Sequence, residues 1–366
     1  MVCFSIIQLK ILSLFGTRPE IIRLSRIFSL LDKNFEHVMV NTNQNYTQEL
    51  NPIFFEQLKI RKPDYDLKIR TDAYGKEVAE IISKSETLLK KEAPDILLIL
   101  GDTNSGLAAI PAAHQNIKIA HLEAGMRSYD PIMPEEKNRV LIDHLSTVLL
   151  PYTAYSRENL IRENIHPSKI FVVGNPIVEV IDHYLPQIKK NGILKKLKLK
   201  QNDYFLVTAH RSENVDNINS LSKIFMGLEK VHKKFNKKII YPMHPRTTSK
   251  LVDKIKISSG IKIIPPLGFF EFSNLERNAF CLITDSGTIP EESLYFKKPC
   301  VTIRNTTERP ETIESGANIL TGLDPQNILE SVITMTSQKP NWAWGDSLGD
   351  GRTSSKVINI LRGKLY

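Results

Sequence analysis

The 366-residue chain is poor in cysteine and has no long apolar run. Its three cysteines, Cys3, Cys281 and Cys300, are far apart and form no CxxC pair, which argues against a disulfide framework or a zinc site and favours a reducing compartment. We expect Cys281 and Cys300, which lie in apolar stretches, to be small core residues. No stretch approaches the ~18 uninterrupted apolar residues of a membrane helix, and the N-terminus lacks the basic start and cleavage site of a signal peptide. We therefore expect a cytoplasmic protein that does not associate with membranes.

Several motifs of cofactor and metal enzymes are also missing. No G-x-G-x-x-G follows a predicted strand, and the chain has no P-loop lysine motif, no G-x-S-x-G and no H-E-x-x-H. These absences argue against hydride transfer, P-loop phosphoryl transfer and zinc hydrolysis. We expect neither a cofactor nor a metal.

The chain carries a net charge of +9. Its lysines are densest at Lys189–Lys200 and Lys230–Lys238. Neither stretch is accompanied by an RNP-like motif, zinc-finger spacing or a series of aromatic residues, so we interpret both as solvated surfaces and expect no nucleic-acid partner.

Short β-branched runs alternate with amphipathic helical patterns along the chain. The strands predicted in the first half are Ile11–Phe15, His37–Asn41, Ile96–Leu100, Ile117–His121, Val148–Leu150 and Ile170–Val173. Those of the second half are Tyr204–Thr208, Ile239–Tyr241, Ile261–Ile264, Leu282–Asp285, Cys300–Ile303 and Ala317–Leu320. The main predicted helices are Pro19–Leu31, Lys76–Lys91, Asn104–Gln115, Tyr155–Asn164, Pro325–Ser337 and Ser354–Leu361. Two such series predict two doubly wound α/β domains with parallel sheets, facing each other across a cleft.

Polar clusters follow most of these strands, where α/β sheets bind their ligands. In the second half, the turn Ser286-Gly287-Thr288 leads into a predicted helix, an arrangement suited to a phosphate. His210, Arg211 and Arg246 are charged donors for such an anion. Further strand-end residues of this half are His244 and Arg309, and a carboxylate in the first helical turn, Glu292, suits ribose hydroxyls.

The first half contributes acids instead. Asp102, Glu123 and Glu135 lie at or just after strand ends. Carboxylates that share a site push one pKa upward, which supplies an acid or base usable near neutral pH. The residues alone thus predict a two-domain α/β enzyme that binds a phosphate-bearing ligand in an acid-lined cleft.

A series of motifs runs in order along the chain. They are GTRPEIIRLSRI (16–27), GDTNS (101–105), HLEAGMRS (121–128), MPEEKNRVLIDH (133–144), VTAHRSENVD (207–216), HPRT (244–247), TDSGTIPEES (284–293), TTERPET (306–312) and GDGRTSSKVINIL (349–361). Taken together, they resemble the non-hydrolysing UDP-N-acetylglucosamine 2-epimerase family over about residues 9 to 361.

The resemblance implies a glycosyltransferase-B-like fold of two Rossmann-like domains, here 1–173 plus 352–366 and 174–351, with the last helix crossing back to the first domain. It also implies a homodimer that inverts C2 of a UDP-N-acetylhexosamine without NAD or metal, to supply cell-surface polysaccharide precursors. In that reaction UDP is lost from C1 together with the C2 proton, which gives a 2-acetamidoglycal, and both are then added back.

Site roles are implied position by position. Asp102, Glu123 and Glu135 match the family's acid–base carboxylates, and His210 matches its histidine at the diphosphate. The remaining matches concern the UDP-sugar: Arg18 as a UDP-contacting residue, Arg139 as a site arginine, Ser286 and Gly287 as the phosphate turn, Glu292 as the ribose carboxylate and Phe272 as the aromatic beside uracil.

The sequence departs from the family pattern at several positions. Arg23 replaces the usual lysine, Gln44–Asn45 replaces Gln-His in a region tied to allosteric activation, and Thr288 replaces the second glycine of S-G-G. Some of these features resemble the subgroup that epimerises UDP-2-acetamido-2,6-dideoxy-L-hexoses, such as UDP-N-acetyl-L-fucosamine synthases. That substrate stays open beside UDP-N-acetylglucosamine, and a retaining glycosyltransferase on the same scaffold is a further alternative.

Overall fold

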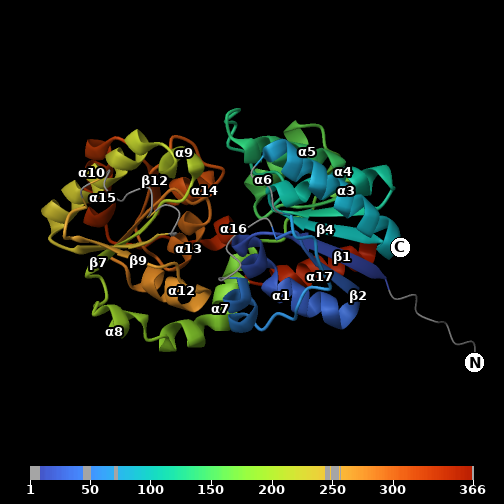
Figure 1. Cartoon of the computed structure of the whole chain (residues 1–366), viewed down its shortest axis with the longest axis horizontal. Coiled ribbons are helices and arrows are strands. Elements are labelled where there is room, and N and C mark those ends of the chain that lie inside the picture. The colour runs from blue at the N-terminus through green and yellow to red at the C-terminus, as the bar shows by residue number, and fades with distance from the viewer. Residues whose placement is uncertain are drawn as a thin grey trace, which may run out of the picture. The chain divides into compact units, whose positions relative to one another are not determined.

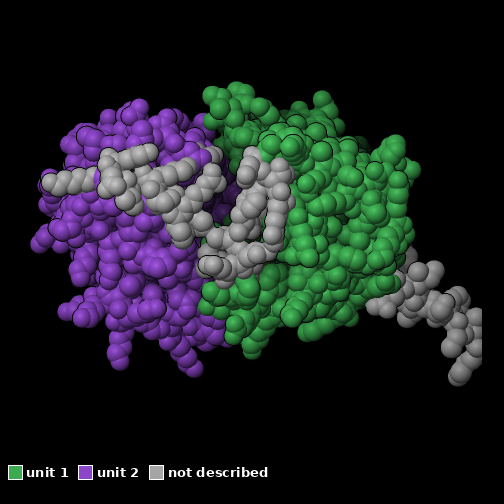
Figure 2. All heavy atoms as spheres, in the orientation of Figure 1, with its two compact units in different colours: residues 1–182, 348–366 green, residues 183–347 purple. Residues whose placement is uncertain are grey.

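The computed structural model describes residues 9–43, 51–69, 73–243, 248, 255 and 257–364. The chain divides into two compact units, Met1–Asp182 with Leu348–Tyr366 (unit 1) and His183–Ser347 (unit 2), coloured green and purple in Figure 2. Helix α7 (Pro176–Lys190) runs through the first boundary. The division therefore lies later in the chain at this crossing than the expected 173/174, and slightly earlier at the second than the expected 351/352.

Unit 1 contains a parallel six-stranded sheet in the order β3-β2-β1-β4-β5-β6. Its strands are β1 (Lys10–Phe15), β2 (Glu36–Asn41), β3 (Tyr65–Asp66), β4 (Ile96–Leu100), β5 (Lys118–Leu122) and β6 (Val148–Leu150). The run ILLIL of β4 is buried throughout, as expected for a central strand that is covered on both faces.

Helices cover both faces of this sheet. The last helix α17 (Thr353–Lys364) returns to unit 1 and packs on α1 (Arg18–Asn34). The opposite face is covered by α3 (Tyr74–Glu92), α4 (Ala109–His114) and α5 (Pro134–Leu145), whose apolar residues share one core with the strands (Figure 1). The other helices are α2 (Asn51–Gln57) and α6 (Ala154–Arg162), with 3₁₀ turns at Asn104–Ala108 and Pro167–Lys169.

Unit 2 repeats the same plan, with the order β12-β11-β10-β7-β8-β9. Its strands are β7 (Tyr204–Thr208), β8 (Lys238–Pro242), β9 (Ile261–Ile264), β10 (Cys281–Thr284), β11 (Cys300–Thr302) and β12 (Asn318–Leu320). Cys281 and Cys300 are free and buried in this sheet, which confirms their prediction as core residues.

The helices of unit 2 form two layers around its sheet. α10 (Ile218–Phe235) and α15 (Pro325–Ser337) pack against each other. A separate buried core joins the strands to α8 (Ile193–Leu197), α12 (Phe269–Asn278) and α13 (Ile289–Tyr295). The shorter helices are α9 (Ser212–Val215), α14 (Pro310–Glu314) and α16 (Gly345–Leu348). The prediction of two Rossmann-like, doubly wound parallel-sheet domains is thus confirmed.

Two predicted elements were wrong. The segment Ile170–Val173 lies beside β6, with backbone N–H groups of Phe171 and Val173 donating to the Leu149 and Pro151 carbonyls at 2.9 and 3.0 Å. It makes only one isolated bridge and is not a regular strand. The predicted helix Asn104–Gln115 is split into a 3₁₀ turn and α4. None of the helices in the described part of the chain combines the length and apolar character needed to cross a membrane.

Candidate active site

In unit 1, the candidate residues gather where the strand order reverses, between the carboxyl ends of β1 and β4. A buried carboxylate, Glu20, joins the turns that follow these strands. It accepts hydrogen bonds from the Gly16 and Thr17 backbone N–H groups at 2.6 and 2.7 Å and from the Thr103 hydroxyl at 2.7 Å. Burial outweighs these bonds and raises the pKa of Glu20. In doubly wound sheets such a switch point is the usual ligand site.

Asp102 follows β4 and is paired with a buried cation. The Arg139 guanidinium on α5 forms ion pairs with both Asp102 and Glu136. The Asn138 side-chain amide donates to the Asp102 backbone carbonyl at 3.0 Å. The structure therefore brings together Asp102 and Arg139, which the sequence placed in one site.

Glu123 ends β5 in a left-handed conformation with φ +73°. A non-glycine residue held there costs on the order of 1–3 kcal/mol, and such residues cluster at functional sites. Its backbone N–H donates to the Leu150 carbonyl at 3.2 Å. Its Oε1 lies 3.8 Å from where a Cβ on Gly101 would stand, so Glu123 lies beside the residue that precedes Asp102.

Glu135 and Glu136 open α5, and the second of them organises the preceding loop. Glu136 accepts hydrogen bonds from the Ser128 and Tyr129 backbone N–H groups, both at 3.0 Å, and from the Ser128 hydroxyl at 3.1 Å. Glu135 is half-buried. Within the described residues, no hydrogen bond or ion pair joins Glu135 to the other two candidate acids, Asp102 and Glu123.

A buried network of charged side chains holds the turn after β4 through the Gly101 carbonyl. His121 places Nδ1 2.7 Å from the Asp143 carboxylate and Nε2 2.8 Å from the Gly101 carbonyl. Both partners are acceptors, so the ring satisfies them when both nitrogens carry a proton. Arg127 bridges Asp143 and Glu163. Burial would raise the pKa of Asp143, but His121 and Arg127 together hold it below its usual value.

The arginines of α1 lie close to the same turns. Arg23 is buried, while Arg18 is half-buried at the first helical position. Burial lowers the pKa of Arg18. The roles of both arginines in binding UDP stay predictions.

In unit 2, a second buried acid holds the corresponding turn between β7 and β10. Asp285 accepts from the backbone N–H groups of His210 and Arg211 at 3.0 Å and from the Asn214 amide at 2.9 Å. In return, Arg211 Nε donates to the Asp285 carbonyl at 3.0 Å. The His210 ring is exposed, with Nδ1 3.4 Å from the Asp285 carboxylate. The predicted anion donors His210 and Arg211 are thus fixed by their backbone.

The turn after β10 is packed more tightly than its sequence suggests. Two backbone N–H groups expected to be free donate within the turn, from Ser286 to Thr284 Oγ1 at 2.9 Å and from Thr288 to Ser286 Oγ at 3.3 Å. A Cβ at Gly287 would stand 2.2 Å from Glu308 Oε1. A side chain at this position would therefore displace the Glu308 carboxylate.

The loop before α14 contributes buried ion pairs rather than open donors. Arg309 Nε lies 2.8 Å from Glu291, and Arg304 lies 2.8 Å from Glu308. Arg211 reaches the same Glu308 at 3.8 Å. Arg309, predicted to bind UDP, therefore has a carboxylate partner already.

The remaining candidates differ in how far the structure describes them. Phe272 is half-buried and packs against the core beneath α12, and Glu292 is buried on α13. His244, Arg246 and the departure at Gln44–Asn45 lie outside the described residues.

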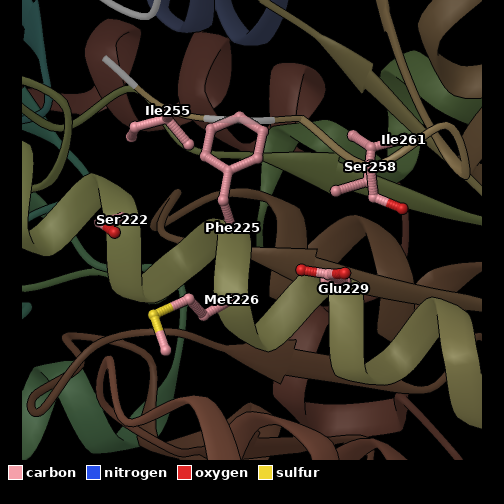
Figure 3. Close-up of a pocket in the computed structure, with 7 residues that line it drawn as sticks. All are labelled: Ser222, Phe225, Met226, Glu229, Ile255, Ser258 and Ile261. Atoms are coloured by element: carbon pink, nitrogen blue, oxygen red, sulfur yellow. The ribbon is translucent and has the colours of Figure 1, made fainter.

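A pocket of about 180 Å³ lies elsewhere in unit 2, beside α10 (Figure 3). None of the predicted site residues lines it. Its lining is Ser222, Phe225, Met226, Glu229, Ile255, Ser258 and Ile261.

The residues that position this site are those the sequence analysis did not single out. Glu20 had a recognisable signal, since a glutamate three positions after Thr17 is typical of a capping box. His121 and Asp143 had none, because their partners are distant in sequence. Glu136 has nearby partners, but its carboxylate was not distinguished from an ordinary first-turn acid. Asp285 was predicted only as the last residue of a strand.

Comparisons with known proteins place these residues in a family context. A family model described as UDP-N-acetylglucosamine 2-epimerase matches residues 30–362. The chain is 44% identical over 365 residues to a UDP-N-acetylglucosamine 2-epimerase of Methanococcus maripaludis, covering 97% of this chain and 99% of that protein. The crystal structure of Methanocaldococcus jannaschii UDP-GlcNAc 2-epimerase in complex with UDP-GlcNAc and UDP has a TM-score of 0.92 at 41% identity, covering 97% of this chain and all (100%) of that one. A solved glycosyltransferase involved in lipopolysaccharide biosynthesis has a TM-score of 0.63 at 10% identity over 97% of this chain and 100% of that one, which shows a shared fold alone.

Proposed function

Because the chain belongs to the UDP-N-acetylglucosamine 2-epimerase family, and is thereby an isomerase, we propose that it interconverts UDP-N-acetylglucosamine and UDP-N-acetylmannosamine. The observation that carries this proposal is the match along almost the whole chain to a solved epimerase whose crystals hold UDP-GlcNAc and UDP. A role in supplying cell-surface polysaccharide precursors is the physiological extension of the same proposal.

The chemistry follows from the position of the reacting carbon. The C2 proton is not adjacent to a carbonyl, so its removal alone would leave an unstabilised carbanion. If a base takes this proton while the C1–O bond breaks in the anti direction, the C–H electron pair forms the C1=C2 double bond and UDP leaves with the C1–O pair. Return of a proton to the other face of C2 and of UDP to C1 gives the epimer. Such a reaction needs positioned acids and bases and a stabilised leaving group.

We assign proton transfer to unit 1. Asp102, ion-paired with Arg139, is the first acid–base group. Glu123, held in a strained conformation beside Gly101, is the second acid–base group, and Glu135 is the third.

We assign the UDP moiety mainly to unit 2. His210 and Arg211 neutralise the diphosphate, supported by the bonds of their backbone to Asp285. The turn Ser286-Gly287-Thr288 lies beside them, Glu292 accepts the ribose hydroxyls and Phe272 stacks on uracil. Arg18, Arg23, His244 and Arg309 are assigned as supporting charges. A homodimer without cofactor or metal, located in the cytoplasm, completes the proposal.

The two alternatives are less well supported. The relative and the solved epimerase described above are named for N-acetylglucosamine, not for a 6-deoxy-L-hexosamine. The glycosyltransferase shares only the fold with this chain, and fold alone does not specify a reaction.

The proposal is tested by proton NMR in deuterated water. UDP-N-acetylglucosamine should exchange its C2 proton for deuterium while the epimer accumulates. A UDP-2-acetamido-2,6-dideoxy-L-hexose, offered in parallel, should react more slowly. Faster reaction of the 6-deoxy-L-hexose would favour that substrate over UDP-N-acetylglucosamine. If neither substrate exchanged its C2 proton, the epimerase proposal would be refuted.

A further inference from the structure

Unit 2 contains a carboxyl group that the proposed reaction does not use. Glu276 lies on α12 and is fully buried, 0% exposed. Among the described residues, no hydrogen-bond donor reaches either of its side-chain oxygens. An ionised carboxylate in such a place is strongly disfavoured, because neither water nor a cation compensates its charge.

The group that Glu276 does meet is a second carboxyl, that of Glu292, where α12 packs on α13. Two ionised carboxylates have no proton to share, so a hydrogen bond between them forms only when one of the pair is protonated. Burial, and then the neighbouring Glu292, raise the pKa of Glu276 well above its usual range.

The other titratable groups around Glu276 do not supply a positive charge. Tyr204 on β7 donates its hydroxyl to the Leu275 carbonyl at 2.6 Å. Cys300 on β11 is a neutral thiol, because burial raises its pKa to about 12. The lysines of α8, Lys195 and Lys196, are exposed.

We propose that Glu276 is a protonated positioning residue, which donates its hydrogen to the Glu292 carboxylate and thereby fixes the orientation in which Glu292 receives the ribose hydroxyls of UDP. This inference rests on the ribose role assigned to Glu292 in the proposed function. The proton belongs on Glu276 because that side chain is 0% exposed, whereas Glu292 keeps 8% of its surface exposed.

Two substitutions separate this role from a merely structural one. Glu276→Gln keeps a donor, its amide, facing Glu292, whereas Glu276→Leu fills similar space without one. The nucleotides UDP and 2′,3′-dideoxy-UDP are titrated calorimetrically into the full-length wild type and both variants. We expect Glu276→Leu to weaken UDP by about tenfold, the scale of one hydrogen bond to a charged group, and to leave dideoxy-UDP unchanged. Glu276→Gln should keep the wild-type preference for UDP.

A pH series supplies a readout that does not depend on the Leu variant folding. In the wild type, the preference for UDP over dideoxy-UDP should decline at alkaline pH as Glu276 loses its proton and its carboxylate repels Glu292. In Glu276→Gln it should stay constant. The ratio of the two affinities cancels the ionisation of the uracil ring and phosphates, which both ligands share.

Each failure has its own signature. If Glu276→Leu keeps the wild-type preference, or if wild type and Glu276→Gln follow the same pH course, the positioning role is wrong. If the wild type binds both nucleotides equally, the ribose role of Glu292 is wrong, and this inference falls with it. A wild type that binds UDP with the expected preference but does not exchange the C2 proton would refute only the epimerase.

Discussion

The two units share one arrangement of strands and turns but place side chains of opposite charge at those turns. In both parallel sheets, the order in which strands are added reverses between the first strand of the unit and its fourth, that is, between β1 and β4 and between β7 and β10. In both, one buried carboxylate holds the turns at that point: Glu20 in unit 1 and Asp285 in unit 2. What the turns then present differs, acids such as Asp102 in unit 1 and cations such as Arg211 in unit 2.

This comparison shows where function resides in the fold. The shared topology explains why the candidate site residues follow β1, β4, β7 and β10, but not which chemistry they perform. In the proposed function, that chemistry comes from side chains at these turns, such as Asp102 and Arg211. Substitutions at corresponding positions of the two units therefore test whether proton transfer belongs to unit 1 and UDP binding to unit 2.

The largest effect is expected from the acid–base side of the comparison. Asp102→Asn should lower turnover by about 100-fold or more, the usual contribution of a general acid or base. UDP affinity should stay near that of the wild type, since the diphosphate is assigned to unit 2. C2 exchange by NMR and calorimetric UDP titration measure the two quantities. A variant that loses UDP affinity in proportion to its rate would contradict the assignment of proton transfer to unit 1 and UDP binding to unit 2.

The second effect concerns the carboxylate that holds the turn of unit 2. Asp285→Asn should lower the free energy of unfolding by about 3 kcal/mol, the scale for loss of a buried charge with fixed partners. The contacts from His210, Arg211 and Asn214 all end on Oδ2, which an amide oxygen can replace. The amide NH₂ then stands in place of Oδ1, where it faces the His210 N–H donor, and the negative charge is lost. Denaturant unfolding measures the loss. A variant as stable as the wild type would show that the two turns do not depend on Asp285.

Much of this frame could be predicted from the sequence, for local reasons. A buried run such as Ile96–Leu100 predicts a central strand by itself, and polar residues after such runs predict a site at the strand ends. The bond from Thr103 to Glu20 spans 83 residues, and it can be foreseen only when β1 and β4 are known to be neighbours. Ile170–Val173 was wrong as a strand because apolar residues do not reveal how far a ladder continues, and here the pairing with β6 stops at one bridge.

The buried acids were beyond prediction for a further reason. Glu276 and Glu136 follow helical spacing that is equally consistent with a solvated face, because a charged residue is normally exposed. Only the packing of neighbouring helices reveals that these carboxyls point inward and what they meet there. Residues that break a local rule in this way are the ones to examine for function.

A smaller effect distinguishes the glycines of the two units. Gly101 in unit 1 has φ +76° and ample space, whereas Gly287 in unit 2 has a neighbour, Glu308, 2.2 Å from its missing Cβ. Alanine at either position should cost about 1–2 kcal/mol, from backbone strain at Gly101 and from crowding at Gly287. Asparagine, which tolerates left-handed backbone, should therefore be better than alanine at Gly101 and worse at Gly287.

Thermal unfolding of the four variants checks this reversal. Gly192→Ala is the matched control in unit 2, because nothing lies within 4 Å of its added Cβ. The same order of asparagine and alanine at both positions would contradict the distinction between strain and crowding.

The smallest effect separates Glu20 from Asp285. In Glu20→Gln the amide can face Thr103, whose hydroxyl is able to accept instead of donate. We therefore expect the free energy of unfolding to fall by about 1 kcal/mol or less at acidic pH.

The pH dependence of stability gives a sharper test of Glu20. Burial raises the pKa of folded Glu20, so the native protein retains a proton that the unfolded chain releases at about pH 4.3. Wild-type stability should consequently fall as pH rises from there through the raised pKa, and the glutamine variant should lack this fall. Stability of the variant relative to the wild type must then improve from acidic to neutral pH, while Glu158→Gln, an exposed control on α6, shows no such trend. A relative stability that worsens with pH would mean that Glu20 is held ionised by its three donors, as a close counterpart of Asp285.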